Sequence, residues 1–107
     1  MAGKKPFTLV YAPQVRDHLR AIERKHHSLI RAKIEEQLRF EPDVETRNRK
    51  PLEESVAFPG AWELRFGQDN RFRVFYDVGA GGREVQVLAI AVKDRDRLFI
   101  AGEEVEL

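Results

Sequence analysis

The sequence predicts an α+β domain in which an N-terminal strand and a helical hairpin precede an antiparallel β-meander. Three observations predict this fold class. Residues 7–11 are rich in β-branched and aromatic side chains, residues 13–38 repeat apolar side chains at helical spacing, and residues 62–92 alternate apolar and polar side chains. We expect the helices to pack on one face of the sheet, because both elements then bury their apolar sides.

The N-terminal elements follow from spacing and prolines. Residues 7–11 (FTLVY) are predicted as a strand, and Pro13 suits the first turn of a helix. An amphipathic stripe runs from Pro13 to about Lys25. A second stripe follows a polar break at residues 26–28 and ends before Pro42, because proline disfavours helical geometry in the residue before it. The two stripes consist of Val15, Leu19 and Ile22, and of Ile30, Ile34 and Leu38.

The second half of the chain is predicted to be β-rich. Residues 43–61 carry charges and prolines with little periodicity, which indicates a long loop. Turn-rich segments at residues 67–71 and 79–82 then separate alternating runs, so we expect antiparallel neighbours. The predicted strands are residues 62–66, 72–78 and 84–92. Residues 98–100 are consistent with either a short strand or a turn packed on the core.

Length and composition set the broad class. The 107 residues suit one domain, residues 1–107, and 42% hydrophobic with 35% charged residues is typical of a soluble globular protein. The chain has no cysteine, which favours a reducing compartment, so we expect a cytoplasmic location. No run of about 18 apolar residues occurs, so membrane insertion is not expected. The basic start is not followed by the apolar segment of a secretion signal, so secretion is not expected either.

Charge is distributed unevenly although the formal net charge is only +1. Residues 1–52 contain 12 Lys/Arg and 7 Asp/Glu, whereas residues 53–107 contain 7 and 11. Such asymmetry suggests a nucleic acid or an oppositely charged partner. The excess in the first half is equally consistent with charges that solvate helix faces.

The predicted strands carry arginines between large apolar residues. Strand alternation places Glu63 and Arg65 on one face and Arg73 on the matching face of the next strand. We expect Arg65 and Arg73 to meet on the face that the helices leave open. A guanidinium fixed on a strand presents a rigid fork of donors that matches phosphate oxygens. The alternative is that Glu63–Arg65 and Arg73–Asp77 are surface ion pairs worth at most about 1 kcal/mol each.

A basic segment and aromatic residues extend this predicted site. Arg47, Arg49 and Lys50 precede the strands in a loop expected to fold over the sheet edge. Phe75 and Tyr76 are then available to stack on bases. Together these residues predict an open cationic groove for single-stranded nucleic acid.

In the order of its predicted elements and in several short motifs, the sequence resembles the RelE/ParE superfamily of toxins from bacterial type II toxin–antitoxin modules. The resemblance covers nearly the whole chain and is strongest at residues 62–65 (WELR), 72–76 (FRVFY) and 89–93 (AIAVK). It implies a RelE-like fold, a small cognate antitoxin protein as partner, and no cofactor. For the RelE branch it implies a metal-independent endoribonuclease that cleaves mRNA, commonly in the ribosomal A site. The alternatives are a ParE-like inhibitor of DNA gyrase and a non-catalytic protein of the same fold that binds RNA or the ribosome.

The resemblance also implies roles for individual residues. Arg73 matches the family's strand arginine beside the scissile phosphate, and Arg65 matches a basic position on the neighbouring strand. Lys50 matches a loop position where neighbouring cations favour its neutral, basic form. Glu63 is the competing base, and Lys93 and Arg95 fall near the C-terminal catalytic segment. Related nucleases carry a histidine or tyrosine near that end, where this chain has Phe99 and Ile100, so the general acid is unassigned.

Other chemistries have little support in the sequence. His18, His26 and His27 lie on or between the predicted helices, without carboxylates at ligand spacing, so no metal site is predicted. The glycines at residues 79–82 sit in a predicted hairpin turn and lack the lysine and helix of a P-loop. Nucleotide cofactors are therefore not expected.

Overall fold

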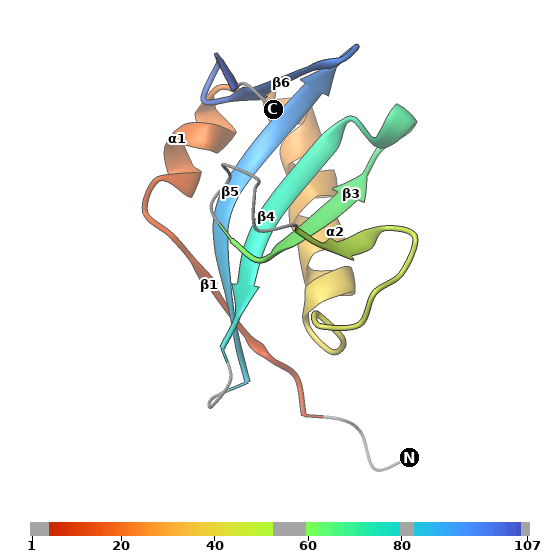
Figure 1. Cartoon of the computed structure of the whole chain (residues 1–107). Helices are drawn as coiled ribbons and strands as arrows, with labels where there is room; N and C mark the ends of the chain where they lie inside the picture. Colours follow the sequence, from red (N-terminus) through yellow and green to blue (C-terminus); the bar gives the residue numbers. More distant parts are fainter. Residues whose placement is uncertain (1–4, 53–59, 80–82, 106–107) are drawn as a thin grey trace.

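The computed structural model describes residues 5–52, 60–79 and 83–105. Within them the chain forms two α-helices and a seven-stranded sheet, so the α+β class is confirmed (Figure 1). The strands are β1 (Thr8–Tyr11), β2 (Arg49–Pro51), β3 (Trp62–Phe66), β4 (Phe72–Val78), β5 (Glu84–Asp94), β6 (Arg97–Ile100) and β7 (Glu103–Val105). The helices are α1 (Val15–Arg20) and α2 (His27–Leu38), with 3-10 turns η1 (Arg24–His26) and η2 (Gln68–Asn70).

The sheet has the order β2-β3-β4-β5-β6-β7, and β1 pairs in addition with β5. All these pairs are antiparallel except β1–β5, which is parallel. Since β4 lies along one edge of β5, β1 and β6 share the other edge: β1 pairs with residues 84–87 and β6 with residues 91–94. The gap between them is filled by α1, where the Gln14 side chain donates to the Leu88 carbonyl at 3.2 Å.

The predicted strands are largely confirmed. The bounds of β3 and β4 match the prediction, β5 is two residues longer, and residues 98–100 belong to strand β6. The prediction of a continuous loop over residues 43–61 was wrong for β2, which pairs with β3. A three-residue strand that ends in proline shows no alternation, and proline is tolerated there because β2 lies at the sheet edge. Residues 53–59 of that predicted loop lie outside the described part of the chain.

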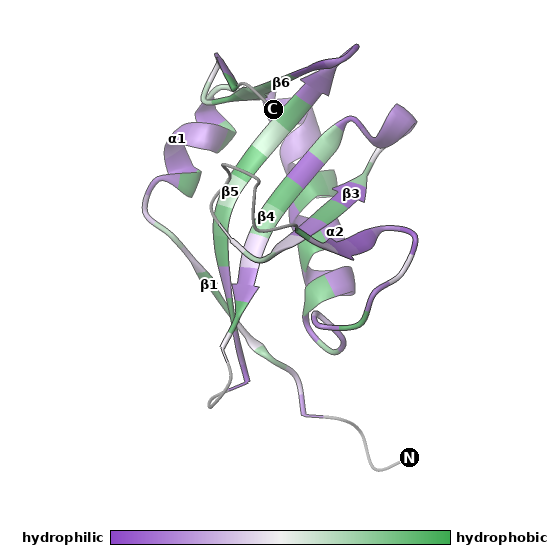
Figure 2. Ribbon diagram, in the orientation of Figure 1, coloured by the Kyte–Doolittle hydropathy of each residue, from purple (hydrophilic) through white to green (hydrophobic). Residues whose placement is uncertain are grey.

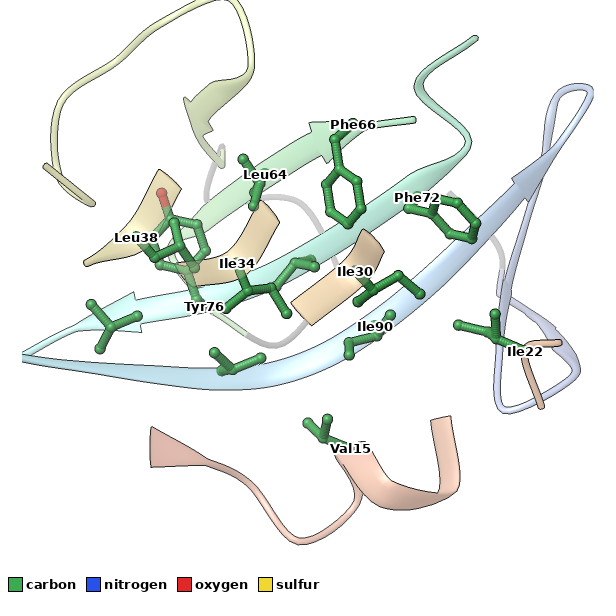
Figure 3. Close-up of a cluster of buried hydrophobic side chains, with 13 residues drawn as sticks. Val15, Ile22, Ile30, Ile34, Leu38, Leu64, Phe66, Phe72, Tyr76 and Ile90 are labelled. Atoms are coloured by element: carbon green, nitrogen blue, oxygen red, sulfur yellow. The ribbon is translucent and has the colours of Figure 1, made fainter. Parts of the chain in front are cut away.

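The two helices differ from the predicted hairpin in length and position. Helix α2 crosses the sheet and buries Ile30, Ile34 and Leu38 against it (Figure 3). Helix α1 ends at Arg20 instead of near Lys25 and lies beside β5. The chain bends after α1, so Ile22 enters the core and its carbonyl accepts a hydrogen bond at 2.8 Å from His27 Nε2. This side-chain interaction replaces another helical turn.

Hydrophobic clusters lie on both faces of the sheet. The larger cluster fills the space between the helices and the sheet (Figure 3). The smaller cluster, on the opposite face, buries Phe75, Ala89, Ala91 and Leu98, with Leu52 and Ile100 packed against it. Figure 2 shows hydrophobic positions along the middle of β5 and hydrophilic positions on β2. The face that the helices leave open therefore carries apolar as well as charged side chains, because residues of β4, β5 and β6 gather there.

In the described part of the chain, neither helix has the length and apolar character needed to cross a membrane.

Candidate phosphate-binding face

Cross-strand register brings the predicted basic residues together on the face opposite α2. Lys50 of β2 lies opposite Glu63 of β3, and Arg65 of β3 lies directly opposite Arg73 of β4. Residues that pair directly across antiparallel strands point to the same side of the sheet. The predicted meeting of Arg65 and Arg73 on one face is confirmed.

Glu63 joins the two arginines into an ion-paired triad, Arg65–Glu63–Arg73. Arg65 Nε donates to Glu63 Oε1 at 2.7 Å, and Arg73 Nη1 donates to Glu63 Oε2 at 3.2 Å. Arg73 Nε also donates to the Asn70 carbonyl at 3.1 Å. The side chains of Glu63 and Arg73 are only 8% and 10% exposed, whereas that of Arg65 is 36% exposed. Arg65 is therefore the outer member of the triad and Arg73 the inner one.

This geometry corrects the expected electrostatics of the two strands. The predicted Glu63–Arg65 pair forms, but among the described residues Arg73 pairs with Glu63 and not with Asp77. Asp77 Oδ1 instead accepts a hydrogen bond from the Ala61 main-chain N–H at 2.7 Å. Arg73 was expected to face solvent, and it is buried because the carboxylate and the Asn70 carbonyl hold it against the sheet.

The basic segment before β3 divides between the two faces of the sheet. Arg49 pairs with Leu64 on the α2 side, so its side chain enters the protein, while Lys50 pairs with Glu63 on the other side. Arg49 Nε donates to the Val44 carbonyl at 3.0 Å, and Arg49 Nη1 donates to the carbonyl and Oε1 of Gln37 at 2.9 and 2.8 Å. The structure therefore assigns Arg49 to anchoring the loop on α2, contrary to its expected place in an open groove. Arg47 and Lys50 are exposed.

The two aromatic residues expected to stack on bases are both fully buried. Phe75 belongs to the smaller hydrophobic cluster. Tyr76 lies in the larger cluster, where its hydroxyl donates to the Pro42 carbonyl at 2.7 Å and burial raises its pKa above the ordinary value. Neither ring is exposed to solvent, contrary to the prediction that both are available to stack on bases. The run of apolar residues in β4 did not reveal that both faces of this strand are buried.

Lys93 and Arg95 line a separate cleft of about 870 Å³ between the end of α1, η2 and the β5–β6 turn. Apolar residues of this cleft are Ile22, Ile90, Val92 and Phe99. Charged residues along it are Arg71, Lys93, Arg95, Glu23, Asp69 and Asp94. The cleft is thus balanced in charge, and the triad residues do not line it.

His18 lines the same cleft and was missed by the sequence analysis as a site residue. It is 8% exposed, and its Nδ1 accepts a hydrogen bond from the Ile90 main-chain N–H at 3.2 Å. Desolvation lowers the pKa of His18, and the neighbouring Asp17 opposes this shift. The available signal was spacing, because His18 falls between Val15 and Ile22 on the apolar stripe predicted for residues 13–25.

Comparison with known proteins returned no matching family model, no matching curated protein and no matching solved structure. The resemblance to the RelE/ParE superfamily therefore remains a prediction from the sequence. Within the described ranges, no group of three or more His, Cys, Asp or Glu side chains is arranged to hold a metal ion. The site is thus characterised by its basic residues and by the carboxylate that joins two of them.

Proposed function

We propose that this chain is the toxin component of a bacterial type II toxin–antitoxin module, a metal-independent endoribonuclease that cuts mRNA and inhibits translation. The observation that carries the proposal is the direct pairing of Arg65 with Arg73 on adjacent strands. Lys50 adds a third cation from the next strand, opposite Glu63. The sequence resemblance supplies the class of reaction and the expectation of an antitoxin partner.

The arrangement suits contact with a polynucleotide backbone. Arg65 is partly exposed, and Lys50 and Arg47 are exposed, so these three side chains are accessible to phosphates. Guanidinium groups bind phosphate oxygens through several parallel N–H donors. Arg73 lies behind Arg65 and contributes its charge from a partly dehydrated position, where screening by salt is weaker.

In the proposed reaction the 2′-hydroxyl of the RNA attacks the adjacent phosphorus. The O2′–P bond forms and the P–O5′ bond breaks, which leaves a 2′,3′-cyclic phosphate and a 5′-hydroxyl, so no water is consumed. Lys50 is the proposed acceptor of the 2′-hydroxyl proton, while Arg65 and Arg73 stabilise the negative charge that develops at the phosphate. The O5′ leaving group takes its proton from solvent, because Lys93 lines the separate cleft and arginine does not release its proton in proteins.

A non-catalytic RNA-binding or ribosome-binding protein is the second candidate function. Glu63 favours it, because each of its carboxylate oxygens already accepts a hydrogen bond from an arginine. Such a carboxylate is poorly placed to act as the competing general base. Binding alone needs only the positive charge of the face.

The test uses purified protein, a single-stranded RNA and a chelator. We expect 5′-hydroxyl and cyclic-phosphate ends in the wild type, with binding and cleavage both reduced at least tenfold in Arg65→Gln. Arg16→Gln is the matched control, since Arg16 is an exposed arginine on α1, and it should behave like the wild type. Binding without cleavage would select the second candidate. Absence of RNA binding, with replication rather than protein synthesis stopping first in expressing cells, would contradict both and favour a gyrase inhibitor.

A further inference from the structure

The triad Arg65–Glu63–Arg73 holds one carboxylate between two guanidinium groups. Each oxygen of Glu63 accepts from a different arginine, at 2.7 and 3.2 Å. A guanidinium carries five N–H groups. Within the described residues Arg65 uses one nitrogen and Arg73 two, so both arginines retain donors while their positions are fixed.

The register of the two arginines favours an anion between them. Arg65 and Arg73 are direct cross-strand partners, and like charges at such positions repel each other. Glu63 offsets this repulsion and leaves the triad with one net positive charge. Because Glu63 and Arg73 are about nine-tenths buried, the interaction is weakly screened by solvent ions.

We propose that the triad is a phosphate-binding site in which the Glu63 carboxylate is the resident, intramolecular anion. A phosphodiester presents two unesterified oxygens that share one negative charge, as a carboxylate does, and arginine binds both groups with the same fork of donors. Glu63 thus has two effects. It positions both guanidinium groups, and it competes with a phosphate for the space between them.

The consequence is that Glu63 sets the affinity of this face for polyanions. This inference depends on the proposed function only for the identity of the polyanion, because the site itself is defined by its affinity for phosphate-like ions. Removal of the carboxylate charge should leave the two guanidinium groups without a counter-anion, so that they take up a small oxyanion. It should also destabilise the fold when no such ion is present, since two partly buried cations then face each other.

The first experiment compares Glu63→Gln with Glu103→Gln, an exposed position on β7 that gives the same change in net charge. Thermal unfolding is followed in sulfate and in chloride at constant ionic strength. We expect sulfate to raise the melting temperature of Glu63→Gln by several degrees more than that of Glu103→Gln or the wild type. Folding of Glu63→Gln in sulfate but not in chloride would support the site in the same way. An equal sulfate effect in all three proteins would overturn it.

A second measurement uses the wild-type protein and does not depend on the variant's stability. Inorganic phosphate is titrated while the Nε–H resonances of Arg65 and Arg73 are recorded by NMR. Displacement of Glu63 should shift both resonances with a common saturation curve. Nε–H resonances that do not shift would overturn the proposal. This titration still tests the proposal if Glu63→Gln folds neither in sulfate nor in chloride.

A third measurement separates this inference from the proposed function. For a single-stranded RNA, Glu63→Gln should bind more tightly than the wild type, and its logarithmic salt dependence should steepen by about 0.7, as expected for one added phosphate contact. A sulfate effect without RNA binding in either protein would retain the site and reject the proposed function. Equal RNA binding by both proteins without a sulfate effect would reject the site and retain the function.

Discussion

The His18 imidazole accepts a hydrogen bond from the main-chain N–H of Ile90, at the part of the β5 edge that neither β1 nor β6 covers. A buried main-chain donor needs a partner, and here a helix side chain provides it in place of a strand. The bond requires an unprotonated Nδ1. The contact therefore links the integrity of the sheet edge to the protonation of one histidine.

We predict that this contact makes folding sensitive to mild acid. The folded-state pKa of His18 is lowered by burial from its ordinary value of 6.5, so its contribution to stability is complete above pH 6.5. The contribution is lost as the pH falls below 6.5 toward the folded-state value, because the unfolded chain binds the proton more readily. Urea unfolding from about pH 7.5 to about pH 5 should show a smaller decrease in the free energy of unfolding for His18→Gln than for the wild type. Identical pH profiles would contradict this assignment.

We predict that Arg49 stabilises the fold by joining the basic loop to α2. Arg49→Met should lower the free energy of unfolding by about 1–3 kcal/mol, because it leaves the partly buried acceptors on Val44 and Gln37 without their charged donor. Arg47→Met, at an exposed neighbouring position, should change it by less than about 0.5 kcal/mol. Chemical denaturation of both variants measures the difference, and similar values would show that Arg49 is not an anchor.

Tyr76 provides a test of the corrected role of the aromatic residues. Tyr76→Phe removes the buried hydroxyl that donates to the Pro42 carbonyl, so we expect a loss of about 1–2 kcal/mol in unfolding free energy. RNA affinity should stay within twofold of the wild type, because the ring is not presented to solvent. Tyr11→Phe, at an exposed tyrosine, is the control for loss of a hydroxyl. A large loss of RNA binding in Tyr76→Phe without a loss of stability would restore the stacking role.

Arg95 lies in the turn between β5 and β6 with φ of 60°, a conformation that costs a non-glycine residue about 1–2 kcal/mol. Arg95→Gly should therefore raise the free energy of unfolding by about 0.5–1 kcal/mol, after the larger entropy that glycine loses on folding is included. Asp96→Gly is the neighbouring control, because the φ of Asp96 is not positive and glycine there should destabilise the turn. If thermal unfolding shows both substitutions to be destabilising, the turn is not strained at Arg95.

Much of the sheet could be predicted from sequence because β3 alternates large apolar and charged side chains over its whole length, and β4 does so except at Phe75. The end of helix α1 could not be predicted, because the apolar stripe continues to Ile22 although the helix ends at Arg20. The shared face of Arg65 and Arg73 followed from period-two geometry. The burial of Arg73 did not, because it depends on which carboxylate the register places between two strands.

The parallel pairing of β1 with β5 has a consequence for how the protein is made. Residues 8–11 have their strand partners at residues 84–87, so β1 can pair only after residues 84–87 have been synthesised. Contacts of such long sequence separation slow folding. During translation β1 therefore stays unpaired until residues 84–87 have left the ribosome, and its backbone donors and acceptors are exposed throughout that time.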